Sequence, residues 1–321
     1  MEIKTMDNRG NGDSGGTVAA NGIPNGDGIT NGAAEGNLFK KQSQAKEIWR
    51  RFKKSKGAVI GLVMFTAIFL VLLCANFITP YSMATKQQLA NKLSPPSAAH
   101  LLGTDAFGRD LFARIIHGGR MSLIVALLAT MTSCVLGSAL GAIAGYFGGK
   151  IDSLIMRSLD IFMSIPDILF TMAVVFALGS SFTNLLFALT LAYFTNYVRL
   201  VRSQVLNLAE LDYVEAARAG GSGSARIILS HILPNAMGVI IVNTTLNVAK
   251  IILYESTLSF LGLGMPPPAP EWGLLLSDAR EYMRDAPYLM FFPALAIVLT
   301  ACSVNLIGDG LRDALDPHLK S

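Results

Sequence analysis

Residues 212–234 read Asp-Tyr-Val-Glu-Ala-Ala-Arg-Ala-Gly-Gly-Ser-Gly-Ser-Ala-Arg-Ile-Ile-Leu-Ser-His-Ile-Leu-Pro, and they separate two long apolar runs, near 183–200 and 235–256. Asp212 and Glu215 have the spacing of a capping box, in which two side chains satisfy the free amides at a helix start. The alanines that follow are strong helix formers. The stretch therefore predicts a short helix on a loop between two apolar helices.

The second half of this stretch predicts a turn and another short helix. Gly220 and Gly221 end the first helix, because glycine readily adopts the conformation of a helix C-terminus. Ser224 is placed to cap a second helix. Pro234 suits the first turn of the next apolar helix, where a backbone amide is not needed. We expect a helix-turn-helix projection, here called the knob (residues 212–234).

The composition indicates a membrane protein. Of 321 residues, 52% are hydrophobic and only 15% are charged, and the mean hydropathy is +0.48. Soluble domains usually carry about 25% charged residues, and disordered or nucleic-acid-binding proteins need more charge, so we exclude these classes. About 20 apolar residues cross a bilayer as a helix. Six runs predict an all-α protein with six transmembrane helices, near 58–79, 121–146, 159–178, 183–200, 235–256 and 288–308.

Basic residues indicate how these helices are oriented. Ten of the 26 Lys and Arg residues precede residue 58, several of them in the basic block 49–56 directly before the first run. Because Lys and Arg favour the cytoplasmic side, we expect both termini inside the cell. The chain then divides into a disordered, Asn-Gly-rich tail (1–45), a basic entry segment with the first helix (46–80), an outer-face loop (81–117) and a core with five helices and the knob (118–315).

The second run carries Gly137, Gly141 and Gly145 at spacings of four residues. This spacing places three positions without side chains on one face of a helix. We expect another helix to approach closely along that face.

Polar residues recur along one face of the fifth run. Asn243, Asn247, Lys250 and Tyr254 follow each other at spacings of four, three and four residues. A central Lys facing lipid costs about 2.5 to 3.5 kcal/mol, so this face should lie against protein or water. It either lines a translocation path or holds the bundle together by hydrogen bonds between helices.

The third run contains a charged pair and a proline. Arg157 lies one turn before Asp160, which predicts an ion pair near the inner end of the helix. Asp160 and Asp167 belong to one polar row of that helix. Pro166 predicts a kink, because it lacks a backbone amide.

The knob resembles the coupling loop found in inner-membrane permease subunits of ATP-binding-cassette importers. That loop has Glu-Ala-Ala, then a Gly, then a Leu-Pro pair at set intervals, and this chain has His231 where the general pattern has Ile. The resemblance implies that ATPase subunits bind at the knob. The residues implied in coupling are Glu215, Ala216, Ala217, Arg218, Gly221, Leu233 and Pro234.

Two further segments, 100–121 and 258–273, resemble the C-type permease of the dipeptide and oligopeptide branch. Together the matching blocks span roughly residues 49–317 and imply the type I importer permease fold in a bacterial or archaeal cell membrane. The second segment predicts a stiff outer loop that either docks the binding protein or anchors the chain at the interface. The residues implied in docking are Pro266, Pro267, Pro268 and Trp272.

The resemblance also implies the partners of the chain. They are a homologous second permease, two cytoplasmic ATPase subunits that bind ATP and Mg²⁺, an extracytoplasmic binding protein and a peptide substrate, with membrane lipid around the helices. The sequence has no Gly-x-x-x-x-Gly-Lys-Ser/Thr phosphate loop, so ATP would be hydrolysed elsewhere. We expect no cofactor, metal or nucleic acid on this chain, and its three cysteines lack metal-ligand spacing.

Other functions compete with this interpretation. A nickel or other small-solute importer of the same family is an alternative. An ion-coupled carrier would use Asp160, Asp167 and Lys250 as a proton or cation path, but it offers no reason for the knob. An intramembrane hydrolase lacks support, because no His-Glu-x-x-His or Gly-x-Ser-x-Gly motif occurs. We therefore expect a transporter subunit and not an enzyme.

Overall fold

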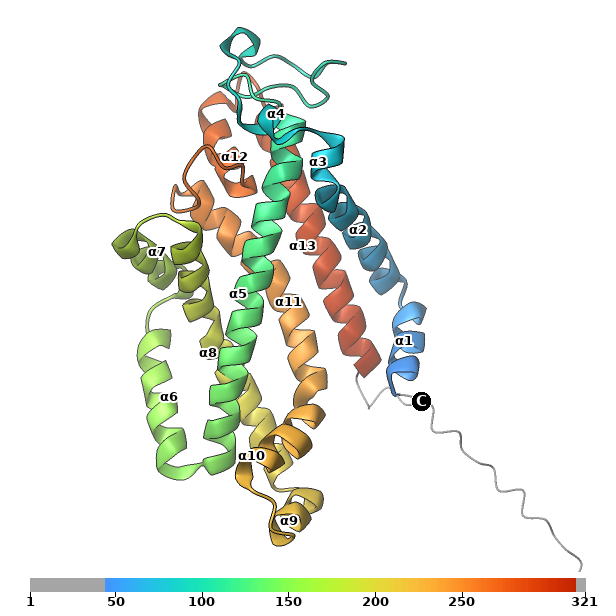
Figure 1. Ribbon diagram of the computed structural model, residues 1–321, viewed down its shortest axis with the longest axis vertical. Helices are drawn as coiled ribbons and strands as arrows, with labels where there is room; N and C mark the ends of the chain where they lie inside the picture. Colours follow the sequence, from blue (N-terminus) through green and yellow to red (C-terminus); the bar gives the residue numbers. More distant parts are fainter. Residues whose placement is uncertain (1–43, 316–321) are drawn as a thin grey trace, which may run out of the picture. The chain divides into compact units, whose positions relative to one another are not determined.

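The computed structural model describes residues 44–315, which form helices and connecting loops without a strand (Figure 1). The predicted disordered tail lies outside the described residues, except that α1 begins at its last two positions. The elements in chain order are α1 (Gln44–Lys54), α2 (Lys56–Leu73), α3 (Ala75–Ile78), α4 (Tyr81–Thr85), η1 (Leu89–Asn91), α5 (Leu111–Phe147), α6 (Gly149–Met163), α7 (Asp167–Leu178), α8 (Phe182–Ala209), α9 (Asp212–Ala219), α10 (Ser224–Ile227), η2 (Ile228–Ile232), α11 (Leu233–Phe260), α12 (Trp272–Ala279), η3 (Arg280–Tyr282) and α13 (Tyr288–Leu315).

All six apolar runs are mainly helical, although 58–79 is divided between α2 and α3 and 159–178 between α6 and α7, and this confirms the helical membrane fold. Within residues 44–315, α2, α5, α11 with its N-terminal extension, and α13 are long and apolar enough to cross a bilayer, and α6 with α7 adds a broken fifth candidate. The run 183–200 lies in α8, which has 28 residues but carries polar side chains such as Asn196 and Arg199. Helix α5 begins at Leu111, earlier than the predicted boundary at residue 118, because the Asp110 carboxylate accepts the Ala113 amide and caps it there.

The run 159–178 is not one continuous helix. Helices α6 and α7 meet at an 82° bend. Pro166 occupies the N-cap position of α7, and a proline can neither donate a backbone hydrogen bond nor follow a helical residue without a clash. The predicted kink at Pro166 is therefore confirmed, and it is a break between two helices.

The break also separates the polar row predicted for this run. Asp160 stays in α6, whereas Asp167 begins α7. Asp160 pairs with Arg199 of α8, with 2.6 Å between Oδ1 and Nη2. The predicted Arg157–Asp160 pair is wrong, because α8 brings a second arginine to the carboxylate from a neighbouring helix.

The glycine face of α5 packs against α8, as its spacing predicts. A Cβ atom on Gly141 would lie 2.5 Å from the Val198 carbonyl oxygen, and one on Gly145 would lie 2.9 Å from the Arg202 carbonyl oxygen. Real side chains do not tolerate such distances, so the two backbones approach this closely only because the side chains are absent.

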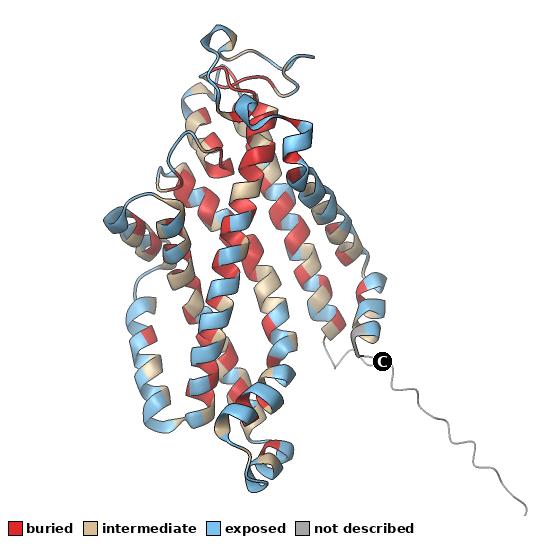
Figure 2. Cartoon of the chain, in the orientation of Figure 1, coloured by how far each residue is buried: buried red, intermediate tan, exposed pale blue. Residues whose placement is uncertain are grey.

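The principal core forms where α5, α8, α11, α12 and α13 face one another. It contains Leu123, Leu189, Ile252, Trp272 and Val304, each at most 5% exposed. Buried positions follow α5, α11 and α13, whereas α6 and α9 are largely exposed (Figure 2). Large apolar side chains also remain on the outer surface of the helices, among them Phe176, which is 83% exposed. Such a surface is suited to contact with lipid or another subunit.

Candidate functional site

The knob has the predicted order of helix, glycine turn and second helical segment. Gly221 has φ +78°, in the left-handed region. The Ser222 amide donates to the Ala217 carbonyl at 3.1 Å, so the turn satisfies a free carbonyl of α9. Pro234 lies in the first turn of α11. The predicted glycine stop and the place of the proline are confirmed.

The predicted capping residues of the knob are wrong. Helix α9 begins with Asp212 itself, so Leu211 is the N-cap residue and no side chain caps the helix. Ser224 likewise begins α10 after the N-cap residue Gly223 and makes no capping bond. Both helix starts are at an exposed end of the bundle, where water can satisfy the free amides.

One face of α9 is buried against the bundle, and its other face is exposed. Val214 of α9 is fully buried in a cluster that also holds Val205 of α8 and Ile232 before α11. Glu215 and Arg218 are exposed on α9, and the Arg218 guanidinium lies 5.6 Å from the centre of the Tyr146 ring. Among the other predicted coupling residues, Ala216, Gly221 and Pro234 are exposed, and Ala217 and Leu233 are half-buried.

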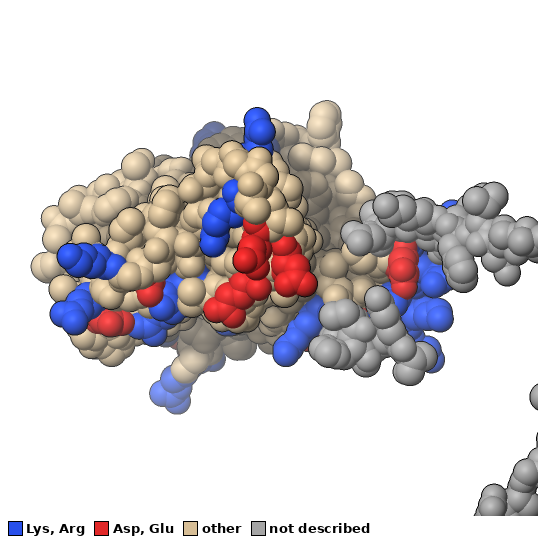
Figure 3. Space-filling view, turned by 90° about the horizontal axis from the view of Figure 1, so that it is seen from below, with Lys and Arg blue, Asp and Glu red and all other residues tan. Residues whose placement is uncertain are grey.

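The end of the molecule that carries the knob has a charge pattern suited to a protein partner. In Figure 3, which is seen from below, acidic side chains gather on this face with basic ones around them. Glu210, Asp212 and Glu215 are exposed at or just before α9 and supply acidic charge at the knob. Charge of this kind fixes the register of a partner more than it adds affinity.

The four polar residues of the predicted helical row meet in one cavity of about 600 Å³. Asn243, Asn247, Lys250 and Tyr254 line it from α11. The cavity is completed by residues that the single-run pattern did not find, because they come from other helices. These residues are Asp167 of α7 and Tyr193, Asn196, Arg199 and Leu200 of α8.

The charged groups of this cavity differ in their pairing. Arg199 is bound to Asp160, at 2.6 Å. Asp167 and Lys250 have no ion-pair partner among residues 44–315. The buried side-chain nitrogen of Asn247 also lacks a hydrogen-bond partner within this part of the chain. Among the described residues the cavity therefore presents unpaired charges of both signs.

The outer loop places Trp272 in the core and not on the surface. Its side chain is 1% exposed, and its indole nitrogen donates to the Ile115 carbonyl at 2.8 Å. The ring of Trp272 is therefore not available for the predicted docking contact, because it packs from α12 against Gly119 of α5. Pro266, Pro267 and Pro268 are exposed and remain available to a docking protein.

Glu255 and Glu271 are fully buried, and Glu271 bonds to the proline-rich loop. Ser122 and Ser256 donate to the Glu255 carboxyl group at 3.1 and 3.2 Å. Glu271, the N-cap residue of α12, accepts the Met265 amide at 2.9 Å. The periodicity of the sequence did not predict this arrangement, because Glu271 lies in a loop and Ser122 lies on another helix.

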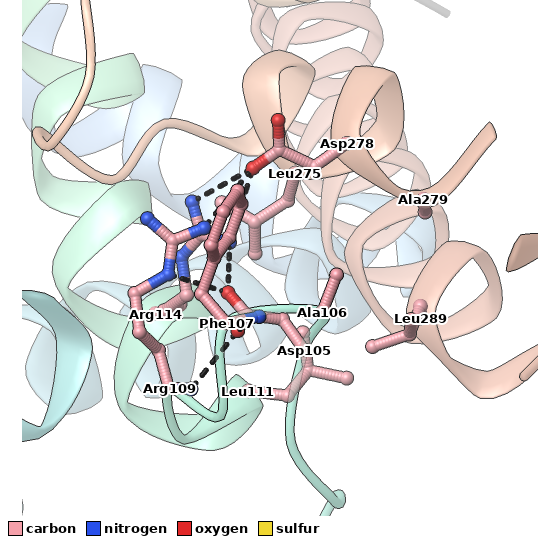
Figure 4. Close-up of a pocket in the computed structure, with 10 residues that line it drawn as sticks. All are labelled: Asp105, Ala106, Phe107, Arg109, Leu111, Arg114, Leu275, Asp278, Ala279 and Leu289. Carbon is pink, nitrogen blue, oxygen red and sulfur yellow. Dashed lines mark hydrogen bonds and ion pairs between the residues drawn. The ribbon is translucent and has the colours of Figure 1, made fainter. Parts of the chain in front are cut away.

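A buried ion-pair network ties residues 105–114, at the start of α5, to α12 (Figure 4). The Asp105 carboxylate accepts hydrogen bonds from Nε of Arg109 and Nη1 of Arg114, each at 2.6 Å. Asp278 of α12 lies 3.3 Å from Arg109 and 3.2 Å from Arg114. The four-residue spacing of Asp105 and Arg109 is a visible signal in the sequence, whereas Asp278 comes from a distant segment.

Comparison with known proteins gives consistent matches. The family described as "Binding-protein-dependent transport system inner membrane component" matches residues 137–321, and the "N-terminal TM domain of oligopeptide transport permease C" matches residues 43–96. The dipeptide transport system permease protein DppC of Alkalihalophilus pseudofirmus is 45% identical over 86% of this chain and 90% of that protein. DppC of Haemophilus influenzae is 40% identical over 88% of this chain and 97% of that protein. The glutathione transport system permease protein GsiD of Pectobacterium atrosepticum is 40% identical over 86% of this chain and 92% of that protein.

A solved structure shows the same fold. An inward-facing MetNI methionine ABC transporter matches with a TM-score of 0.51 and 19% identity, over 64% of this chain and 98% of that one. The resemblance predicted from the knob and the two outer segments is thus confirmed by relatives of nearly equal length. The chain belongs to the family of inner-membrane components of binding-protein-dependent transport systems, as a multi-pass permease subunit and not an enzyme.

Proposed function

We propose that this chain forms half of the translocation path of an ATP-binding-cassette importer for dipeptides or oligopeptides. A homologous permease forms the other half, two cytoplasmic ATPase subunits bind at the knobs, and an extracytoplasmic binding protein delivers the substrate. ATP and Mg²⁺ are held by the ATPase subunits. Both termini and the knob face the cytoplasm.

The observation that carries this proposal is that the knob and the cavity share the same helices. Helix α9 follows α8 directly, and the second half of the knob continues into α11. These two helices provide Tyr193, Asn196, Asn243 and Lys250 to the cavity. The buried cluster around Val214 makes the knob and the ends of both helices one packed body. When an ATPase subunit displaces α9, the distances between the residues that line the cavity therefore change.

The dipeptide cargo is supported by the names of the relatives and by the cavity. DppC proteins of two organisms are about as long as this chain and align along most of it. The cavity is lined by amide, phenol and charged groups, which suit the hydrogen-bonding groups of a peptide.

The test is purification of the native complex followed by transport. The chain is tagged and extracted gently from its own membranes, its partners are identified by mass spectrometry, and the complex is reconstituted in liposomes with its binding protein. We expect a second permease, two ATPases and ATP-dependent uptake of radiolabelled dialanine. Uptake of radioactive nickel in place of dialanine would show that the cargo is nickel and not a peptide. Ion-driven transport by the chain alone would replace the proposal with an ion-coupled carrier.

A further inference from the structure

We propose that Asp167 and Lys250 bind the two charged ends of the peptide, Asp167 its N-terminal ammonium group and Lys250 its C-terminal carboxylate. This inference rests on the proposed peptide cargo and names the chemistry by which the cavity recognises it. The site thereby selects zwitterions, and neutral or singly charged solutes bind it less well.

The pairing of charges in the cavity is the first observation behind this assignment. Three charged side chains line the cavity, and Arg199 is occupied by Asp160. Asp167 and Lys250 have opposite charges and line the same cavity, yet they form no ion pair with each other or with any residue in 44–315. Two groups whose role was to hold α7 against α11 would be in contact. Because Asp167 and Lys250 are not paired with each other, they give the cavity one negative and one positive group for a ligand.

The local structure at each end explains how an unpaired charge is tolerated there. Asp167 is the first residue of α7, directly after the break at Pro166, and a carboxylate is stabilised by the free amides and positive dipole of a helix start. Lys250 lies in the middle of α11, where facing lipid would be unfavourable, and its side chain is exposed toward the cavity. The first residue of α7, directly after the break in the third run, thus contributes a carboxylate to the cavity.

Between the two ends, the cavity offers hydrogen-bonding groups to a peptide backbone. Asn243 and Asn247 lie one turn apart on α11. The Asn243 side chain is half-buried and lines the cavity, so its amide group can hydrogen-bond to a peptide group there. Tyr193 and Tyr254 pack edge to face, with ring centres 5.5 Å apart, and form an amphipathic wall beside these groups.

The experiment measures binding without the binding protein, whose own selectivity would otherwise dominate. The complex of both permeases and the ATPases is placed in lipid nanodiscs, and saturation-transfer NMR is recorded with three probes: dialanine, N-acetyl-dialanine and dialanine amide. We expect dialanine to bind and each blocked peptide to bind about fivefold more weakly, the size of one solvated ion pair.

Two variants separate recognition from structure. Asp167→Asn is expected to remove the preference for dialanine over the N-acetyl peptide and keep the preference over the amide. Lys250→Met is expected to remove the preference for dialanine over dialanine amide and keep the preference over the N-acetyl peptide. Lys150→Met removes a lysine from an exposed position of α6 outside the cavity and should leave both preferences unchanged.

The possible results distinguish this inference from the proposed function. Equal binding of the three probes to the wild-type complex, or an equal loss for all three in each variant, overturns the inference. Dissociation of the second permease from Lys250→Met in native mass spectrometry also overturns it, because the lysine would then pair with that subunit. Dialanine uptake by the full system in any of these cases leaves the proposed function in place, whereas absence of uptake removes both.

Discussion

At the scale of single residues, Gly221 shows how one backbone conformation supports the proposed coupling. Its φ of +78° turns the chain between α9 and α10, and a Cβ atom there would meet nothing within 4 Å. The position therefore needs glycine for its dihedral angles and not for lack of space. Gly223, two residues later, also has open space around it but a φ of −68°, which any residue adopts.

We predict that Gly221→Val uncouples ATP hydrolysis from uptake and Gly223→Val does not. A β-branched residue in the left-handed region costs about 1 to 3 kcal/mol, so the turn of the knob would shift while the helices stay inserted. The measurement is uptake per ATP hydrolysed in proteoliposomes that contain the full complex. Normal coupling in Gly221→Val, or an equal loss in both variants, would contradict the prediction.

The outer ion-pair network gives a second prediction at this scale. Asp105 is 4% exposed and bonds both arginines, whereas Asp278 is 29% exposed at its side chain. Removing one partner of a buried pair costs about 3 to 5 kcal/mol, because a buried charge is left uncompensated. Asp105→Asn should therefore lower the melting temperature of the purified chain in detergent far more than Asp278→Asn. Similar melting temperatures for the two variants would show that the network does not stabilise the fold.

At the scale of elements, the crossing of α5 and α8 is set by the absence of side chains. Gly137, Gly141 and Gly145 lie against the backbone of α8 and let it approach. Helix α8 also carries cavity residues and leads into the knob, so its position relative to α5 affects both.

We predict that Gly141→Leu destabilises the chain and Ala139→Leu, on an exposed position of the same turn, does not. Overpacking typically costs about 1 to 3 kcal/mol, and contact with backbone atoms leaves little room to relax. Size-exclusion chromatography after a heating series would measure the loss of folded protein. Equal heat resistance of the two variants would refute the role of the glycine face.

At the scale of the whole molecule, the two functional ends lie on opposite sides of the membrane-spanning helices. Figure 1 places α9 and α10 at one end of the described bundle and the segment before α5 at the other. The basic block before α2 and the end of α13 lie toward the knob side, which agrees with a cytoplasmic knob.

This orientation predicts which positions a membrane-impermeant maleimide can reach. In a variant without native cysteines, Lys86→Cys on the outer segment should be labelled in intact cells, and Lys150→Cys only after permeabilisation. Both lysines are exposed in the structure, so the barrier is the membrane and not burial. The opposite labelling pattern would reverse the proposed topology.

Features set by local patterns were readable from the sequence. The length of the apolar runs determined the helical membrane fold, the four-residue spacing of Gly137, Gly141 and Gly145 determined a face for close packing, and Gly221 determined the turn of the knob. The row from Asn243 to Tyr254 also predicted one shared surface, because positions on a helix follow a fixed period.

Only the tertiary structure decided which helix meets which side chain. Asp160 pairs with Arg199 and not with Arg157, and Trp272 lies in the core although it follows a proline-rich loop. The charged ends of the cavity come from α7 and α11, which are far apart in the chain. Helical period assigns a residue to a face of its own helix, but the partner across that face depends on how all the helices pack, and no local spacing records it.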